Sequence, residues 1–394
     1  MRTFYEFFAG GGMARAGLGD GWKCLFANDF DRKKAATYQR NWGDKEMLAD
    51  DIRNIRSEQL PIYADLIWGS FPCQDLSLAG GGAGLKGNRS GTFWPFIDII
   101  QRLRKEGRAP AVIALENVVG TLTSHKGSDF AAICRSLKDL GYRYGAFVVD
   151  AALFLPHSRP RLFFIAVRND LVPFGSNDNP NSPWHTSSLR KAYGALPSDL
   201  MESWVWWDMP IPPKRQTRFA DLIEDEPTGV QWHTTAETRA LLSMMSDVNL
   251  AKVETAKAAG VRMVGGLYKR TRFQHGIKIQ RAEVRFDDIA GCLRTPAGGS
   301  SRQLILVVDG KKIKSRLIST RETARLMGLS DNYYLPSTYN EAYHLTGDGV
   351  AVPVVRHITK NIIEPVVDFS RANNLVEFPK KSRKELSQKL RSRK

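Results

Sequence analysis

Residues 3–18, TFYEFFAGGGMARAGL, decide the fold of the N-terminal part of the chain. An apolar run of strand length, residues 3–9, ends in three glycines, and helical spacing begins directly afterwards. Glycines let the backbone approach a ligand, and the N-terminus of a helix favours anionic groups. A second strand, residues 22–28, leads to Asn28 and Asp29, where an acidic side chain commonly binds ribose hydroxyls. The pattern predicts a nucleotide-type loop that could hold NAD, FAD or S-adenosylmethionine.

The same alternation of strands and helices continues as far as Arg168. Three short apolar runs predict strands, at residues 64–69, 111–115 and 161–167. Three segments with helical spacing accompany them, at residues 32–40, 93–105 and 130–140. Strands that alternate with helices form parallel βαβ units. We therefore expect an α/β fold with a doubly wound, mostly parallel sheet.

The texture of the sequence changes after Arg168. Residues 169–218 are rich in Pro, Asn, Ser and Trp, and residues 261–308 are rich in Gly and Arg with short β-like runs. These features predict a smaller, irregular, β-containing lobe at residues 170–340. The first domain, residues 1–169, would then be completed by about residues 341–378. The last residues, 379–394, are polar and basic, which is typical of a mobile tail.

The composition favours a nucleic-acid partner and excludes several classes of protein. The 394 residues include 57 Lys and Arg against 41 Asp and Glu, so the formal net charge is +16. Such a charge is typical of proteins that bind polyanions, most often nucleic acid. The four cysteines form no CxxC pair, which argues against zinc ribbons, disulfide scaffolds and a metal site. Neither a signal peptide nor a membrane helix of about 18 apolar residues is present, so a cytoplasmic protein is expected.

Chemically useful side chains stand beside three of the predicted strands. Cys73, in the segment GSFPCQDLS, follows the strand at residues 64–69, and Glu116 follows the strand at residues 111–115. Arg159 and Arg161 flank Pro160 at the start of the next strand. Ligands of α/β sheets bind at the carboxyl ends of the strands, so Cys73 and Glu116 are expected at one edge. A thiol at that edge can be an activated nucleophile.

Taken in order, these segments resemble the signatures of the bacterial and phage DNA (cytosine-5)-methyltransferases. The FAGGG loop, the acidic strand end, the PCQ loop, the ENV triplet and the RxR pair recur in family order. Residues 321–326 resemble the later REAARLQ-type helix of that family, and residues 347–350 resemble its closing GNxV segment. The resemblance covers nearly the whole chain. It implies an S-adenosylmethionine-dependent methyltransferase fold in which residues 170–340 form the target-recognition lobe.

The resemblance implies catalytic roles for four residues. Cytosine C5 is a poor nucleophile until a thiolate adds to C6, and Cys73 would be that thiolate. Glu116 is assigned to N3 and the exocyclic amine, and Arg161 to O2, where both would stabilise the intermediate. Arg159 would supply a second cation near the same centre. The target cytosine must leave the duplex for this attack, because C5 and C6 are buried in the base stack.

The resemblance also implies S-adenosylmethionine as the cofactor, with Phe8 against the adenine, Asp29 on the ribose and Asp51 near the adenine amine. The full set of cofactor-binding candidates is Phe8, Ala9, Gly10, Gly12, Asn28, Asp29, Asp51, Ile52, Pro72, Asp348 and Val350. The sequence departs from the family pattern at four places, one of which is Ser90-Gly91-Thr92, where an Arg-Gly start is usual. Asp348 stands where Asn is usual, His157 where Gln is usual, and Cys292 where Thr is usual.

Double-stranded DNA is the implied partner of a protein expected to be monomeric and free of the membrane. The candidates for DNA recognition are arginines, which contact phosphates or guanine edges: Arg270, Arg272, Arg281, Arg285, Arg294 and Arg302. A cognate restriction endonuclease that acts separately is a further partner that the resemblance allows. Three alternatives stand beside this interpretation: an RNA (tRNA) cytosine-5 methyltransferase, a catalytically inactive DNA-binding relative, and a Rossmann oxidoreductase. The large lobe favours DNA, and the set of four candidate catalytic residues favours an active enzyme.

Overall fold

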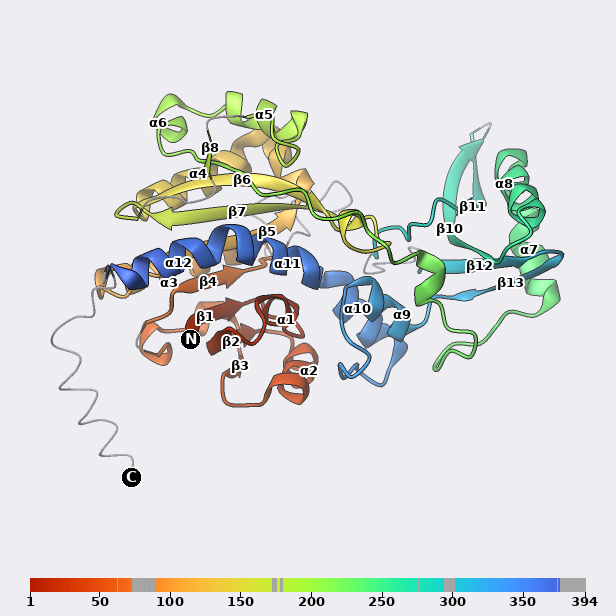
Figure 1. Cartoon of the computed structure of the whole chain (residues 1–394), viewed down its shortest axis with the longest axis horizontal. Coiled ribbons are helices and arrows are strands. Elements are labelled where there is room, and N and C mark those ends of the chain that lie inside the picture. Colours follow the sequence, from red (N-terminus) through yellow and green to blue (C-terminus); the bar gives the residue numbers. More distant parts are fainter. Residues whose placement is uncertain are drawn as a thin grey trace. The chain divides into compact units, whose positions relative to one another are not determined.

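In a computed structural model, the protein folds into two compact units, which are described one at a time (Figure 1). The structure describes residues 1–61, 63–72, 85, 90–171, 176–177, 180–274, 276–293, 302–373 and 375. Unit 1 takes the described parts of Met1–Val149, Pro160–Ile211 and Val354–Lys394, and unit 2 those of Asp150–Arg159 and Pro212–Pro353. Each unit is therefore assembled from segments that lie far apart in the sequence.

Unit 1 is built around a seven-stranded sheet of the described residues. Its strands are β1 (Arg2–Phe7), β2 (Trp22–Asp29), β3 (Met47–Ala49), β4 (Leu66–Gly69), β5 (Val112–Val118), β6 (Tyr142–Asp150) and β7 (Pro160–Arg168). Their order across the sheet is β3-β2-β1-β4-β5-β7-β6. The pairs among β3, β2, β1, β4 and β5 are parallel, whereas β7 runs antiparallel to β5. The mostly parallel α/β fold class expected from the sequence is confirmed.

Helices cover the sheet of unit 1 because each buries one apolar stripe. They are α1 (Met13–Leu18), α2 (Arg32–Trp42), α3 (Phe93–Lys105), α4 (Ser128–Asp139), α5 (Ser187–Gly194), α6 (Ser198–Met201), α11 (Val352–Ile358) and α12 (Glu364–Ala372). In α3 the apolar residues Phe93, Phe96, Ile100 and Leu103 recur at helical spacing and are fully buried. They pack in one core with strand residues such as Phe7 and with the buried face of α4. A short pair of strands, β8 (Ser176–Asn177) and β9 (Trp206–Trp207), completes the unit.

Unit 2 holds a four-stranded antiparallel sheet with the order β11-β10-β12-β13. Its strands are β10 (Met263–Gln274), β11 (Ile277–Arg285), β12 (Leu304–Asp309) and β13 (Lys312–Leu317). Its helices are α7 (Thr235–Ser243), α8 (Asp247–Ala258), α9 (Thr320–Leu326) and α10 (Tyr339–Asp348). Leu267, Val284 and Leu306 of the sheet pack with Val253 and Ala256 of α8 in a separate core. The second, smaller β-containing part that the sequence predicted is therefore present.

The edges of the compact units differ from the domain limits expected at residues 170 and 340. The segment from Asn169 to Ile211 belongs to unit 1, because Trp204 lies in its core and the indole N–H of Trp207 donates to the carbonyl of Ile165 at 3.0 Å. Residues 150–159 and 341–353 belong instead to unit 2. Among the described helices, none is long and apolar enough to span a membrane. Which part catalyses and which part recognises the target stays a prediction.

Candidate functional site

The carboxyl edge of the sheet in unit 1 brings most of the sequence-predicted residues together. β1, β2, β4 and β5 are parallel and end at this edge, where the glycine loop, Asp29, Ser70 and Val118 follow or close them. β7 runs the other way, so it begins at this edge, with Arg161 opposite Val118. The antiparallel direction of β7 therefore carries Arg161 to the residues of the ENV triplet.

Glu116 and Arg161 form an ion pair at this edge. The Nε atom of Arg161 lies 3.1 Å from Oε1 of Glu116, and both side chains are largely buried. The guanidinium also donates from Nη1 to the carbonyl of Pro160 at 2.9 Å. In a partly desolvated site, an Arg fork and a carboxylate hold each other in a fixed orientation. Two of the four expected catalytic side chains are therefore adjacent and preorganised.

Asn117 connects this pair to the loop that contains Cys73. Its side-chain N–H donates to the carbonyl of Phe71 at 3.2 Å, and its Oδ1 accepts from Val118 N at 2.8 Å and Thr121 Oγ1 at 3.2 Å. Pro72 is partly buried next to Phe71, and Cys73 itself lies outside the described residues. Asn117 was not among the site residues predicted from the sequence. A polar side chain at the end of a buried strand could have indicated it.

The glycine loop of unit 1 is strained and open on one side. Phe8 has φ 56°, an unusual value for a residue with a side chain, and Gly10 and Gly12 have φ 55° and 81°. Strain of this kind costs about 1–3 kcal/mol and clusters at ligand sites. A Cβ atom added to Gly10 would meet nothing within 4 Å, so the loop faces open space there. Ala9 closes the loop with a hydrogen bond from its N–H to the carbonyl of Asn28 at 2.9 Å.

Asp29 ties the end of β2 to this loop. Its carboxylate accepts from the backbone N–H of Gly10 and of Asp31, both at 2.8 Å. Burial raises the pKa of Asp29 above its ordinary value. The next residue, Phe30, is 75% exposed although it is aromatic. Phe30 was not predicted from the sequence as a site residue. Its position as a large apolar residue directly after an acidic strand end could have indicated it.

Three of the cofactor candidates in unit 1 have structural partners. The Asn28 amide donates to the carbonyls of Leu48 and Asp50, at 3.0 and 2.8 Å, so it joins β2 to β3. Asp51 begins a short 3₁₀ turn and accepts from Arg53 N at 2.9 Å. Ile52 is buried in the hydrophobic core. Of these three, only Asp51 keeps a partly exposed side chain.

Trp42, near the end of α2, supports the glycine loop from behind. Its indole N–H donates to the carbonyl of Gly11 at 3.0 Å. A Cβ atom added to Gly12 would come within 2.4 Å of the same indole nitrogen and 2.9 Å of the Tyr38 ring. The hydrogen bond between Trp42 and Gly11 was not predicted, because the local sequence pattern does not connect residues that lie 31 positions apart.

Arg159 and His157 lie in unit 2 and are buried there. Arg159 is 2% exposed, and its guanidinium donates to the carbonyls of Gly347 at 2.8 Å, of Gly349, and of Leu293 at 3.4 Å. The Nε2 atom of His157 accepts from Leu293 N at 3.3 Å, so its Nδ1 donates to the carbonyl of Leu326 at 3.0 Å. These contacts fix the guanidinium of Arg159 within unit 2, and its expected place as a second cation near the catalytic centre stays a prediction.

The remaining candidates are also in unit 2. Asp348 is exposed at the end of α10, and Val350 is buried. Five of the six arginines are described, and Arg294 lies outside the described residues. Four of them, Arg270, Arg272, Arg281 and Arg285, stand on β10 and β11. Arg302 stacks over Tyr339, with 5.7 Å between its guanidinium carbon and the ring centroid.

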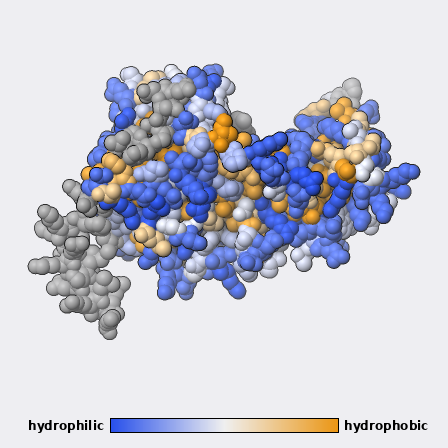
Figure 2. Space-filling model, viewed as in Figure 1, coloured by the Kyte–Doolittle hydropathy of each residue, from blue (hydrophilic) through white to orange (hydrophobic). Residues whose placement is uncertain are grey.

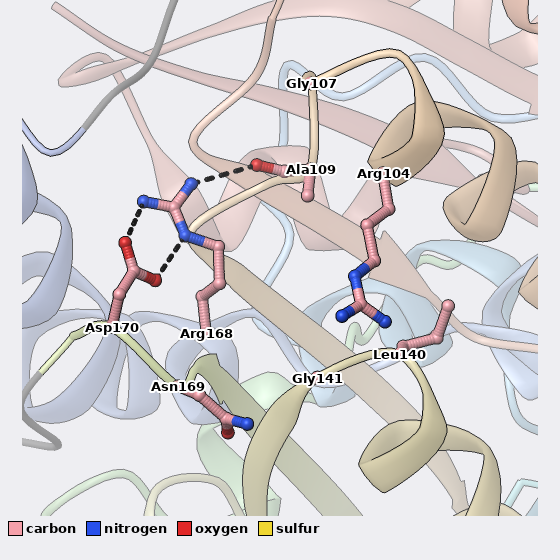
Figure 3. A pocket seen from close by; sticks show the side chains of 8 residues that line it. All are labelled: Arg104, Gly107, Ala109, Leu140, Gly141, Arg168, Asn169 and Asp170. Atoms are coloured by element: carbon pink, nitrogen blue, oxygen red, sulfur yellow. Dashed lines mark hydrogen bonds and ion pairs between the residues drawn. The ribbon is translucent and has the colours of Figure 1, made fainter.

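A cavity of about 350 Å³ lies away from this site, at the opposite edge of the sheet in unit 1 (Figure 3). It is lined by residues at the end of α3, at the end of β7 and just before β5 and β6, among them Arg104, Gly141 and Arg168. Arg168 is fully engaged with Asp170, at 2.6 and 2.8 Å, and with the carbonyl of Ala109. Within the described ranges, no group of His, Cys, Asp and Glu could hold a metal ion.

Comparison with known proteins gives a single family. The family model described as C-5 cytosine-specific DNA methylase matches residues 2–364. The chain is 25% identical over 361 residues to the type II methyltransferase M.HhaI of Haemophilus parahaemolyticus, which covers 91% of this chain and 93% of the relative. It is 27% identical over 385 residues to M.HpaII of Haemophilus parainfluenzae, with 92% and 89% covered.

Solved structures agree with this fold. The Entamoeba histolytica methyltransferase EhMeth superposes with a TM-score of 0.59 at 14% identity, and 93% of this chain and 98% of that chain are covered. A putative DNA modification methyltransferase encoded within an Escherichia coli prophage gives a TM-score of 0.57 at 16% identity, over 93% and 100% of the two chains. The family model spans almost the whole sequence, and Glu116 of the ENV triplet and Arg161 of the RxR pair meet at one sheet edge. The chain therefore belongs to the C-5 cytosine-specific DNA methylase family, as a DNA (cytosine-5)-methyltransferase.

Proposed function

We propose that this enzyme methylates C5 of a cytosine flipped out of double-stranded DNA, with S-adenosylmethionine as methyl donor and Cys73 as nucleophile. The observation that carries the proposal is the buried Glu116–Arg161 pair, 3.1 Å apart, beside the Asn117 side chain that holds the carbonyl of Phe71. Cys73 follows Phe71 by two residues in the chain. A nucleophile, a carboxyl group and a guanidinium are the groups that this reaction needs.

Three side chains of this enzyme act on the flipped cytosine: Cys73, Glu116 and Arg161. The Cys73 thiolate adds to C6, and the electron density that it donates moves toward N3 and O2. Glu116 holds a proton at N3, and Arg161 donates hydrogen bonds to O2, so both stabilise the developing charge. After methyl transfer, a base removes the C5 proton and the C6–sulfur bond breaks, which returns the Cys73 thiolate.

The glycine loop fits the cofactor. Its open side at Gly10 leaves room for a ligand, the Asp29 carboxylate accepts from the N–H of Gly10, and the exposed Phe30 follows Asp29 in the chain. A carboxylate suits ribose hydroxyls, and an aromatic face suits a purine. S-adenosylmethionine, when bound, supplies the methyl group as a sulfonium. Phe8, Ala9, Gly10, Asp29 and Asp51 would hold it in unit 1. Asp348 and Val350 stay proposed as cofactor-binding residues.

Trapping on a modified base tests the nucleophile. Duplex DNA with 5-fluorocytosine in the methylated site should form a stable adduct, because fluorine cannot leave as the C5 proton does. Peptide mapping by mass spectrometry should find the adduct on Cys73. Cys73→Ser should abolish transfer of label from S-adenosylmethionine to duplex DNA while DNA binding persists, and Cys134→Ser is the matched control with normal turnover. An adduct on Cys24, Cys134 or Cys292, or transfer of label to tRNA in place of DNA, would overturn the proposal.

A further inference from the structure

The hairpin of β10 and β11 in unit 2 gathers four arginines on one of its two faces. In the antiparallel register, Arg270 lies opposite Arg281, and Gly266 opposite Arg285. Directly opposed residues point to the same face, and side chains alternate along each strand. One face therefore carries Tyr268, Arg270, Arg272, Arg281, Glu283 and Arg285, with Ile277 and Ile279 toward the turn, and it is called the arginine face.

The other face of the hairpin belongs to the core of unit 2. Leu267 on β10, and Ala282 and Val284 on β11, are completely buried. They pack with Val253 and Ala256 of α8, which lies beside the hairpin in Figure 1. Toward the outer end of the hairpin, hydrophobic surface is visible over β10 and β11 in Figure 2, where Phe273 of this face and Ile277 of the arginine face are exposed. On the arginine face, Tyr268 packs beside Gly291, whereas Arg270, Arg272 and Arg285 are exposed and can contact a partner.

The charges on the arginine face do not serve stability. Arg270 and Arg281 are like charges at directly opposed positions, an arrangement that destabilises an antiparallel pair. Four guanidiniums share this face with one carboxylate, Glu283. A concentration of positive charge at a cost in stability is typical of a surface that binds a polyanion. The DNA substrate of this enzyme family is such a polyanion.

Glu283 holds two of these arginines at once. Its Oε1 accepts from Arg272 Nε at 2.7 Å, and its Oε2 lies 3.5 Å from Arg270 Nε. Both arginine side chains remain 53% exposed, whereas that of Glu283 is 28% exposed. Exposed ion pairs of this kind contribute little to folding. These ion pairs instead affect DNA binding, because a phosphate must compete with the Glu283 carboxylate for the same arginine N–H groups.

We propose that Glu283 is a specificity-determining residue of the arginine face. By occupying Arg270 and Arg272, it weakens their attraction to phosphates of unrelated DNA and keeps both forks oriented toward base edges. An oriented guanidinium can bind guanine O6 and N7, and a carboxylate can accept from the amino group of cytosine. The proposal rests on the proposed function, in which duplex DNA is methylated at a specific site.

Two duplexes and one variant test the proposal. Bisulfite sequencing of cells that express the wild-type enzyme gives the methylated site, and one 20-bp duplex carries this site while the other carries it scrambled. Glu283→Gln should bind the scrambled duplex about tenfold more tightly at low salt, because two arginines become available to phosphates. The slope of log K against log salt should steepen by about one to two units. Methylated sites mapped in cells should become more degenerate.

Glu254→Gln is the matched control, since it makes the same charge change on α8, where the exposed Glu254 pairs with Lys257 away from the hairpin arginines. It should leave the slope and the mapped sites unchanged. In a background of Arg270→Gln and Arg272→Gln, Glu283→Gln should have no further effect on the scrambled duplex. Equal slopes for Glu283→Gln and Glu254→Gln, or a full effect without the two arginines, would overturn the proposal. Failure of the proposed function would appear differently, as absence of label transfer by the wild-type enzyme.

Discussion

At the scale of single residues, burial changes the pKa of Glu6, which lies on the strand that leads into the glycine loop. Its carboxyl group is 1% exposed on β1, and the Tyr38 hydroxyl lies 3.5 Å from it, held in turn by Arg15 at 3.0 Å. Cys24 faces the same cluster at 3.4 Å from the Tyr38 hydroxyl. Desolvation outweighs the attraction to Arg15 and raises the pKa of Glu6 to about 8. The carboxyl group therefore stays protonated in the folded protein at pH values where it is ionised in the unfolded chain.

This difference predicts a pH dependence of stability. Between the ordinary pKa of 4.5 and about 8, the folded state binds a proton that the unfolded state has released. The contribution of Glu6 to the free energy of unfolding should therefore be complete below pH 4.5. It should fall as the pH rises to about 8, by at most about 1.4 kcal/mol per pH unit. Glu6→Gln should flatten this slope in urea unfolding at pH 5, 6, 7 and 8. An unchanged slope, equal to that of the surface variant Glu254→Gln, would contradict the prediction.

At the scale of elements, α2 connects the two ends of the proposed cofactor site. Its N-cap residue, Asp31, accepts from the backbone of Lys33 at 2.9 Å just after Asp29 and Phe30. Its last residue, Trp42, donates to the carbonyl of Gly11. A helix that is fixed at one end by a cap and bound at the other to the loop can hold both at a constant separation.

Trp42→Phe tests this role because it keeps an aromatic ring and removes the donor. Loss of one hydrogen bond to a backbone carbonyl costs about 0.5–1.5 kcal/mol. We expect S-adenosylmethionine to bind roughly 2- to 12-fold more weakly in calorimetry. Trp207→Phe removes the same type of bond, to Ile165 at 3.0 Å, outside the loop, and should leave the affinity unchanged. Equal affinities for the Trp42 variant and the wild type would remove Trp42 from the site.

Sequence reasoning predicted the elements with clear periodicity and missed those set by distant contacts. The helix at residues 93–105 was predicted with its observed limits, because its apolar stripe is regular. β6 was missed, since Gly145 interrupts its apolar pattern. A Cβ atom there would lie 1.8 Å from the carbonyl oxygen of Val205, so a segment 60 residues away requires this glycine. The burial of Arg159 against Gly347 and Gly349 was hidden for the same reason.

At the scale of the whole molecule, unit 1 is closed by ion pairs between the beginning and the end of the chain. Arg2 Nε donates to Asp368 at 2.8 Å, across 366 positions of sequence. Arg371 donates to both oxygens of Asp65, at 2.9 and 2.6 Å, and this carboxylate also accepts from Thr3 N. Asp65 is almost fully buried, so Arg371 is the cation that compensates its charge.

Arg371→Ala should therefore destabilise unit 1 by about 1–2 kcal/mol, less than for a fully buried pair because Arg371 is partly exposed. Urea unfolding followed by tryptophan fluorescence measures this loss. Arg102→Ala breaks the exposed pair with Asp98 on α3 and should cost less than about 1 kcal/mol. If both variants lost the same free energy, the closure by Asp65 and Arg371 would contribute nothing beyond an ordinary surface contact.

The division of unit 1 into distant segments has a consequence for biosynthesis. A ribosome adds about 5–20 residues per second, so roughly 10–40 s separate the emergence of Val149 from that of Val354. Val366 and Val367 of α12, which are completely buried in the finished protein, leave the ribosome later still. Until then the nascent chain carries an uncovered apolar surface, which exposes it to aggregation. Cellular yield of this enzyme should accordingly depend on chaperones that act at the ribosome and on the speed of translation through unit 2.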